Sequence, residues 1–136
     1  MMAAQYVIEN TFGLSAYNLD DEELKAIGAN GCGSKGGWIK IPNYSFGHAC
    51  DHHDAAYWIG GDWMARWCAD CDFLAAMLET AKDQVWYYRI HLEFAARRYY
   101  WAVRWFGEKH FNQGEPRTRK DVDAAVVEMH RQERGR

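Results

Sequence analysis

Cys50-Asp51-His52-His53-Asp54-Ala55-Ala56-Tyr57 is the stretch that decides the predicted fold, and Gly60-Gly61 follows it. The stretch contains neither Pro nor Gly. Ser45 precedes it as a candidate N-cap and the glycine pair can end it, so we predict a helix over residues 46–59. Five of its residues recur at spacings of three and four and share one broad face: Phe46, Cys50, His53, Asp54 and Tyr57. A His–Asp pair among such neighbours indicates a functional site.

The composition indicates one folded domain. The 136 residues suffice for a single hydrophobic core, and with 49% hydrophobic and 15% aromatic residues extensive disorder is excluded. The formal net charge of −3 argues against a nucleic-acid-binding protein that depends on bulk positive charge.

Transmembrane and secretory segments in a sequence indicate where in the cell the protein is found. No apolar run reaches the roughly 18 residues of a transmembrane helix. Residues 1–6 lack a basic region followed by an apolar block, so the sequence predicts no secretory signal. We expect synthesis in the cytoplasm, with later release or association with a virion left open.

Further segments predict helices and complete an all-α fold. Asp20 and Glu23 form the pattern of a capping box for a short helix that ends at Gly28. Asp62 can cap a second helix that runs to about residue 80 or 82, with Trp63, Arg66, Asp70, Phe73 and Met77 on one face.

A long aromatic helix is predicted over residues 83–106, and Gly107 can end it. We expect it to lie mainly in the core, along a seam that begins at Val85 and ends at Phe106. We assign residues 1–110 to one helical domain. Residues 111–136 are expected to form a linker and a short helix, opened by Thr118 and Asp121, or a tail.

The Gly60-Gly61 turn predicts that its two flanking helices run antiparallel. His53 and Asp70 are equally far from the turn, so they should lie level with each other. Asp70 shares the apolar face, whereas Asp72 lies about 200° further round the helix and is expected at the surface. We therefore predict a His53–Asp70 contact, which would fix the imidazole tautomer and make its other nitrogen a better base.

A glycine-rich loop over residues 30–37 precedes this helix pair and can turn its backbone groups toward an ion. Asp54 points about 100° away from His53 and can meet the carbonyl groups of that loop. A carboxylate with several backbone oxygens is a hard, oxygen-rich site. Such a site suits Ca²⁺ better than a soft metal.

Three motifs carry a resemblance to a known family, over about residues 30–77. Cys50-x-x-His53-Asp54-x-x-Tyr57 resembles the active-site helix of the phospholipase A2 superfamily. Gly31-Cys32-Gly33 looks like the calcium loop of that family. Arg66-x-x-Ala69-Asp70-x-x-Phe73-x-x-x-Met77 is similar to the second helix of its short prokaryotic and viral members. The implied fold is an antiparallel helix pair with a Gly-rich calcium loop, followed here by the long aromatic helix.

The resemblance implies a calcium-dependent esterase that hydrolyses the sn-2 ester of glycerophospholipids, at a phospholipid or membrane surface. In that family pattern His53 is the general base that activates water, Asp70 orients it, and Tyr57 donates a hydrogen bond to Asp70. The ion would polarise the ester carbonyl and stabilise the oxyanion. The implied ligands of Ca²⁺ are Asp54, the carbonyl groups of Gly31 and Gly33, and Asn30. Cys32 and Cys50 match a disulfide of the family.

The chain also departs from the family pattern. Position 49 is Ala where secreted animal members have a second Cys, and Cys68 and Cys71 have no counterpart. Asp72 has a rival claim to the role of Asp70, because Cys71-Asp72 copies a Cys-Asp pair of the animal enzymes.

Two other functions compete with the esterase. One is a catalytically silent member of the same fold that acts as a binding or effector protein. The other is a helical module stabilised by zinc on Cys32, Cys50, Cys68 and Cys71. The width of the apolar surface on residues 83–106 leaves room for a protein partner or a membrane face.

Overall fold

The computed structural model describes residues 18–29 and 46–135, and within them the chain is helical with no strand. The all-α prediction is therefore confirmed. The helices are α2 (Asp21–Ala26), α3 (Gly47–Ile59), α4 (Trp63–Ala81), α5 (Trp86–Phe106) and α6 (Arg119–Arg134), with a 3₁₀ turn, η2 (Glu108–His110). In the described part of the chain, each helix is too short or too polar to cross a membrane.

Side-chain caps begin three of these helices as predicted. The Asp20 carboxylate accepts from Glu23 N at 2.8 Å, and the Glu23 carboxylate accepts from Asp20 N at 3.0 Å. Asp62 Oδ1 accepts from Ala65 N at 2.9 Å at the start of α4. Thr118 begins α6 with a capping box. These bonds satisfy backbone donors that have no partner within the helix.

Helix α3 begins after Phe46, one residue later than predicted, and Phe46 makes no side-chain capping bond. Ser45 itself lies outside the described residues. The Phe46 ring is fully buried and meets the Tyr99 ring edge-on, with 6.1 Å between centroids. Packing of this aromatic ring therefore helps to fix the start of α3.

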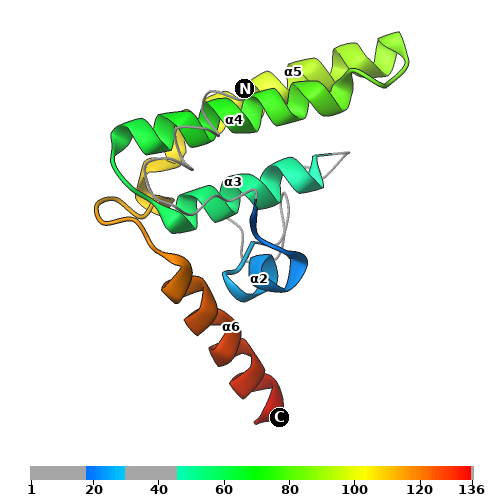
Figure 1. Ribbon diagram of the computed structural model, residues 1–136. Coiled ribbons are helices and arrows are strands. Elements are labelled where there is room, and N and C mark those ends of the chain that lie inside the picture. Colours follow the sequence, from blue (N-terminus) through cyan, green and yellow to red (C-terminus); the bar gives the residue numbers. More distant parts are fainter. Residues whose placement is uncertain (1–17, 30–45, 136) are drawn as a thin grey trace.

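Helix α3 lies between two groups of helices (Figure 1). On one side α4 and α5 form a long antiparallel pair, and the largest core cluster joins them to the start of α3. On the other side α2 and α6 meet α3 around Val122, which is fully buried. Val122 belongs to one hydrophobic cluster with Leu24, Ala55 and Ile59. His53 and Asp54, which we expect to carry function, therefore lie on the central helix, α3.

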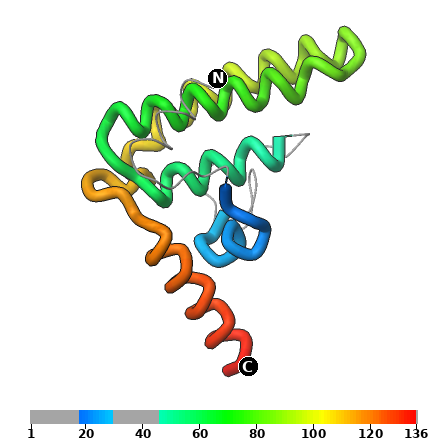
Figure 2. Tube along the Cα trace, viewed as in Figure 1, coloured from blue at the N-terminus to red at the C-terminus, as the bar shows by residue number. Residues whose placement is uncertain are grey.

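The turn between α3 and α4 is fixed by a distant part of the chain. Gly60 has a φ of 81°, and a Cβ atom there would lie 2.0 Å from the carbonyl oxygen of Asn112. Gly61 N donates to Asn112 O at 3.0 Å, and Asn112 N donates to Tyr57 O at 3.1 Å. The tube in Figure 2 shows the segment after α5 passing beside this turn. Residues 111–117 are therefore bound to the helix pair along their length.

Helix α5 differs most from its prediction. It begins at Trp86, three residues later than expected, after a turn that follows α4. The two ends of the predicted seam are exposed, with 55% of Val85 and 64% of Phe106 accessible. The expectation that this helix lies mainly in the core is wrong, because its buried residues form one narrow face: Leu92, Ala95, Ala96, Tyr99 and Val103. Only α4 and the start of α3 cover it, so its opposite face has nothing to pack against within the described residues.

Candidate active site

His53 and Asp70 face each other across the α3–α4 hairpin, and both are buried. His53 Nε2 lies 2.7 Å from Asp70 Oδ1. The predicted contact is therefore present, at the level that the Gly60-Gly61 turn imposes. In a pair with a carboxylate, Nε2 carries the proton and donates it, so Nδ1 holds the lone pair.

Aromatic rings hold the imidazole of His53 in one orientation. The Phe73 ring stacks on it with 4.4 Å between centroids, and the Tyr57 ring lies 4.3 Å away at a tilt of 41°. A ring enclosed in this way has little freedom to rotate. The direction of Nδ1 is therefore fixed before any substrate arrives, which is the condition for efficient proton transfer.

Tyr57 is a second donor to the same carboxylate oxygen. Its hydroxyl donates to Asp70 Oδ1 at 2.7 Å, as the resemblance implied. Burial, together with the negative charge of Asp70, raises the pKa of Tyr57 well above its usual value. The hydroxyl therefore stays protonated and remains a donor throughout the physiological pH range.

Two arginines complete the surroundings of Asp70. Arg104 Nη1 donates to Asp70 Oδ2 at 2.6 Å, and Arg66 Nη1 lies 3.5 Å from the same oxygen. Arg66 also donates to the Tyr57 hydroxyl at 3.2 Å and to the Val103 carbonyl at 3.1 Å. A fully buried carboxylate needs such partners, because an uncompensated charge in the interior is costly. Helix α5 is therefore part of this site.

The sequence contained a signal for one of these arginines and not for the other. Arg66 lies four residues before Asp70 on the predicted face, where an ion pair along a helix is expected. Arg104 is one of four arginines on α5, and no spacing distinguishes it from the others. Only the packing of α5 against α4 shows that its side chain reaches Asp70.

We expect Arg104→Met to lower the free energy of unfolding by about 2 kcal/mol, because the buried Asp70 carboxylate loses its closest cation. This expected loss is smaller than that for a fully buried ion pair, because the Arg104 side chain is 23% accessible to solvent. Denaturant unfolding followed by circular dichroism measures this change. Arg98→Met on the exposed side of α5 is the control and should change stability by less than about 0.5 kcal/mol. Equal effects of the two changes would contradict the role assigned to Arg104.

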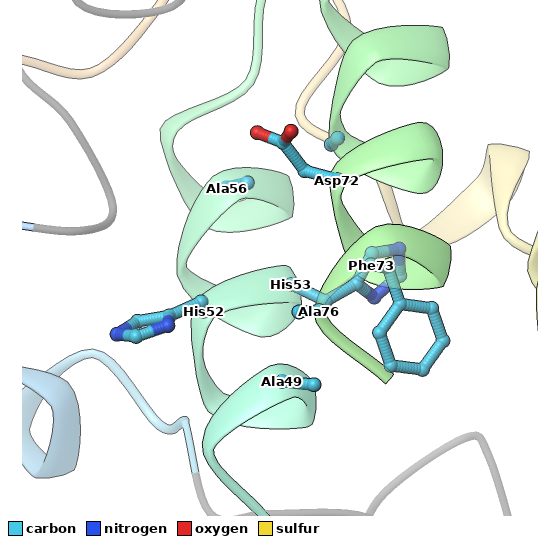
Figure 3. A pocket seen from close by; sticks show the side chains of 8 residues that line it. Ala49, His52, His53, Ala56, Asp72, Phe73 and Ala76 are labelled. Atoms are coloured by element: carbon cyan, nitrogen blue, oxygen red, sulfur yellow. The ribbon is translucent and has the colours of Figure 1, made fainter. Parts of the chain in front are cut away.

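Asp72 is not where the sequence placed it. We expected a surface residue, but Asp72 is 6% exposed and lines a small pocket between α3 and α4 together with His53. Figure 3 shows the Asp72 carboxylate on the α4 side of this pocket, whereas the His52 ring points away from α4. Four alanines of the two helices leave this space open: Ala49, Ala56, Ala69 and Ala76. Because these alanines are small, α3 and α4 approach closely and bury Asp72, although its angular position on α4 alone predicted exposure to solvent.

The predicted calcium site is described in part. Asp54 follows His53 on α3 and is half-buried. Asn30, Gly31 and Gly33, its predicted fellow ligands, lie outside the described residues. A carboxylate is the hard oxygen ligand that Ca²⁺ prefers, but within residues 18–29 and 46–135 no two further His, Cys, Asp or Glu side chains join Asp54 in a cluster that could hold a metal ion, so the calcium site stays a prediction. The position of Asp54 next to His53 would place an ion beside the base.

The cysteines bear on the zinc alternative. Cys68 and Cys71 are free thiols on α4, and burial raises the pKa of both. Cys50 is buried in the core cluster beside Phe46 and Phe73. Among residues 18–29 and 46–135, no three Cys, His, Asp or Glu side chains come close enough together to hold a metal ion. The three described cysteines therefore give no support to a shared zinc site.

The implied Cys32–Cys50 disulfide stays a prediction, because Cys32 lies outside the described residues. We expect it to form in the presence of oxidant, while Cys68 and Cys71 remain thiols. It would close a loop of about 18 residues, which contributes roughly 3 kcal/mol to stability in the chain-entropy model. Peptide mapping under non-reducing conditions tests the pairing. Alkylation of Cys32 in the oxidised protein would contradict it.

Comparison of the chain with models of protein families, with characterised proteins and with solved structures finds no match. A fixed imidazole with an oriented lone pair, a compensated carboxylate behind it and a second carboxylate beside it is suited to removing a proton from water.

Proposed function

We propose that this protein is a calcium-dependent, phospholipase A2-like esterase that hydrolyses the sn-2 ester of glycerophospholipids. The observation that carries the proposal is the buried His53–Asp70 pair, with 2.7 Å between Nε2 and Oδ1. A surface His–Asp pair would be an ordinary ion pair. In this pair, aromatic rings enclose the His53 imidazole and two arginines compensate the Asp70 carboxylate. Such surroundings are unusual for a pair that only stabilises the fold.

The described residues support the roles that the resemblance implies. With Nε2–H held by Asp70, His53 Nδ1 takes a proton from water as that water attacks the ester carbonyl. Asp70 keeps the tautomer and stabilises the imidazolium that forms. The same Nδ1 proton then goes to the leaving alkoxide, which restores the neutral imidazole. Asp54 and the loop would hold Ca²⁺, which when bound supplies charge stabilisation to the carbonyl oxygen.

A single assay tests this proposal. Phosphatidylcholine with a labelled sn-2 acyl chain is incubated with the protein in Ca²⁺, and again in an excess of a calcium chelator. We expect release of the labelled fatty acid only in Ca²⁺, and no release by His53→Gln. Full activity in the chelator would contradict the role of the ion. An inactive protein that retains its fold would favour the silent binding protein instead.

A further inference from the structure

Helix α5 carries an exposed aromatic and basic face that the proposed reaction does not use. Projected at about 100° per residue, nine residues fall within about 120° of one another, opposite the buried face of this helix, and one of them, Arg104, is turned to Asp70 at the edge of the sector. The other eight form the exposed face. We call them the outer face of α5: Trp86, Tyr87, Ile90, Phe94, Arg97, Arg98, Trp101 and Trp105. Trp86, Phe94 and Trp105 expose 73%, 68% and 72% of their surfaces.

The size of this face sets it apart from ordinary surface residues. Scattered apolar side chains on a surface need no explanation, but a continuous row along one helix indicates a contact. The helix has 21 residues and is about 31 Å long, and the row runs from its first residue to its last turn. By contrast, Val127 is the only large hydrophobic residue that α6 exposes. The row lies outside the stretch on which the resemblance rests.

The charge of the outer face favours one kind of partner. Arg97 fills the interval between Phe94 and Trp101, and its guanidinium donates to the Glu93 carbonyl at 3.2 Å. In the described part of the chain, no carboxylate lies within ion-pair distance of Arg97 or Arg98. Helix α5 as a whole has four Arg and one Glu, although the complete chain is acidic. The expected partner is therefore anionic as well as apolar.

A second copy of this chain fits the face poorly. Two α5 helices related by a twofold axis at their midpoint, near residue 96, would bring Arg97 and Arg98 of both copies together. Like charges brought together in this way oppose association. A nucleic acid is disfavoured because the formal net charge of the chain is −3, whereas nucleic-acid binding depends on a surplus of positive charge. A bilayer accepts Trp and Tyr rings at headgroup depth and offers phosphates to the arginines.

We propose that the outer face of α5 binds a membrane surface rich in anionic phospholipid. The aromatic rings insert between the headgroups and Arg97 and Arg98 contact the lipid phosphates. The proposal rests on the proposed function only in naming the lipid surface from which substrate would come. Arg104, on the same helix, contacts Asp70, so the docking helix is also a wall of the candidate site.

The experiment measures binding without turnover. The full-length protein is sedimented with vesicles of ether-linked phosphatidylcholine, which cannot be hydrolysed, with and without ether-linked phosphatidylglycerol. We expect binding only when phosphatidylglycerol is present. Because each basic residue near an anionic surface contributes about one kcal/mol, the double change Arg97→Gln/Arg98→Gln should weaken binding by about 30-fold. Trp101→Ala/Trp105→Ala should weaken it as well, at unchanged lipid charge.

The matched control is Lys109→Gln/Lys120→Gln, which removes the same charge from exposed positions outside α5. It should leave binding within about threefold of the unchanged protein. Equal binding to neutral vesicles, or equal loss in the control, would overturn the proposal. Concentration-dependent dimers that Trp101→Ala/Trp105→Ala abolishes, without vesicle binding, would assign the face to a second copy instead. An inactive protein that still binds anionic vesicles would refute the esterase and leave this proposal intact.

Discussion

Asp70→Asn is expected to lower the rate of phospholipid hydrolysis by about four orders of magnitude, the loss seen when the carboxylate behind a catalytic His is replaced by an amide. The amide cannot stabilise an imidazolium, and it can present N–H to Nε2, which would reverse the tautomer of His53. In addition, it leaves Arg104 beside a neutral group. The measurement is kcat on labelled phosphatidylcholine, corrected for the folded fraction by circular dichroism.

Asp72→Asn is the matched control, since Asp72 is also buried on α4 and is only two residues away. The hydrogen bonds and ion pairs of Asp70 come from His53, Tyr57, Arg66 and Arg104, and Asp72 is not among these partners, so we expect a loss of about tenfold or less. Because Asp70→Asn can also destabilise the fold, Tyr57→Phe gives a milder test: it removes one hydrogen bond to Asp70 and should cost about tenfold in rate. Inactive Asp72→Asn with active Asp70→Asn would assign the supporting carboxylate to Asp72.

Asp54→Asn is expected to abolish calcium binding and to lower hydrolysis by about two to three orders of magnitude, the usual loss of a group that stabilises an oxyanion. The change preserves the shape of the side chain and removes its charge, so the helical fold should remain. Calorimetric titration with Ca²⁺ measures the affinity, and the esterase assay measures the rate.

Asp51→Asn is the control for the calcium site, because Asp51 lies on the same helix, is also half-buried and has the same charge. It should change neither calcium affinity nor rate by more than about threefold. If Asp54→Asn kept full calcium affinity, the ion would be held elsewhere or not at all. If it lost affinity but kept full activity, the reaction would not depend on the ion.

The sequence predicts the helix pair well because the determinants are local. Gly60-Gly61 specifies a tight turn, Asp62 caps α4, and the helical period places His53 level with Asp70. Each inference needs only residues within about 20 positions of one another. The contact between the side chains of His53 and Asp70 could therefore be predicted from the sequence.

Other features depend on packing between distant segments, and there the pattern fails. Asp72 is buried because alanines let α3 and α4 approach closely, a property of the pair that no single helical projection contains. Arg104 reaches Asp70 from 34 residues away. Apolar residues do recur at helical spacing along α5, but this spacing alone cannot show whether another helix packs against the outer side of α5.

The contact between Arg104 and Asp70 also has a consequence for the order in which the chain folds. During synthesis α3 and α4 leave the ribosome before α5, and domains form from the N-terminal side. Until residue 104 emerges, a closed hairpin would hold Asp70 without its closest cation and without the helix that covers it, and Arg66, at 3.5 Å in the complete protein, would be its nearest cation. Desolvating the carboxylate even partly with this weaker partner opposes closure. The nascent hairpin is therefore expected to stay open and hydrated until α5 is complete, so that no partly made chain presents an assembled His–Asp pair.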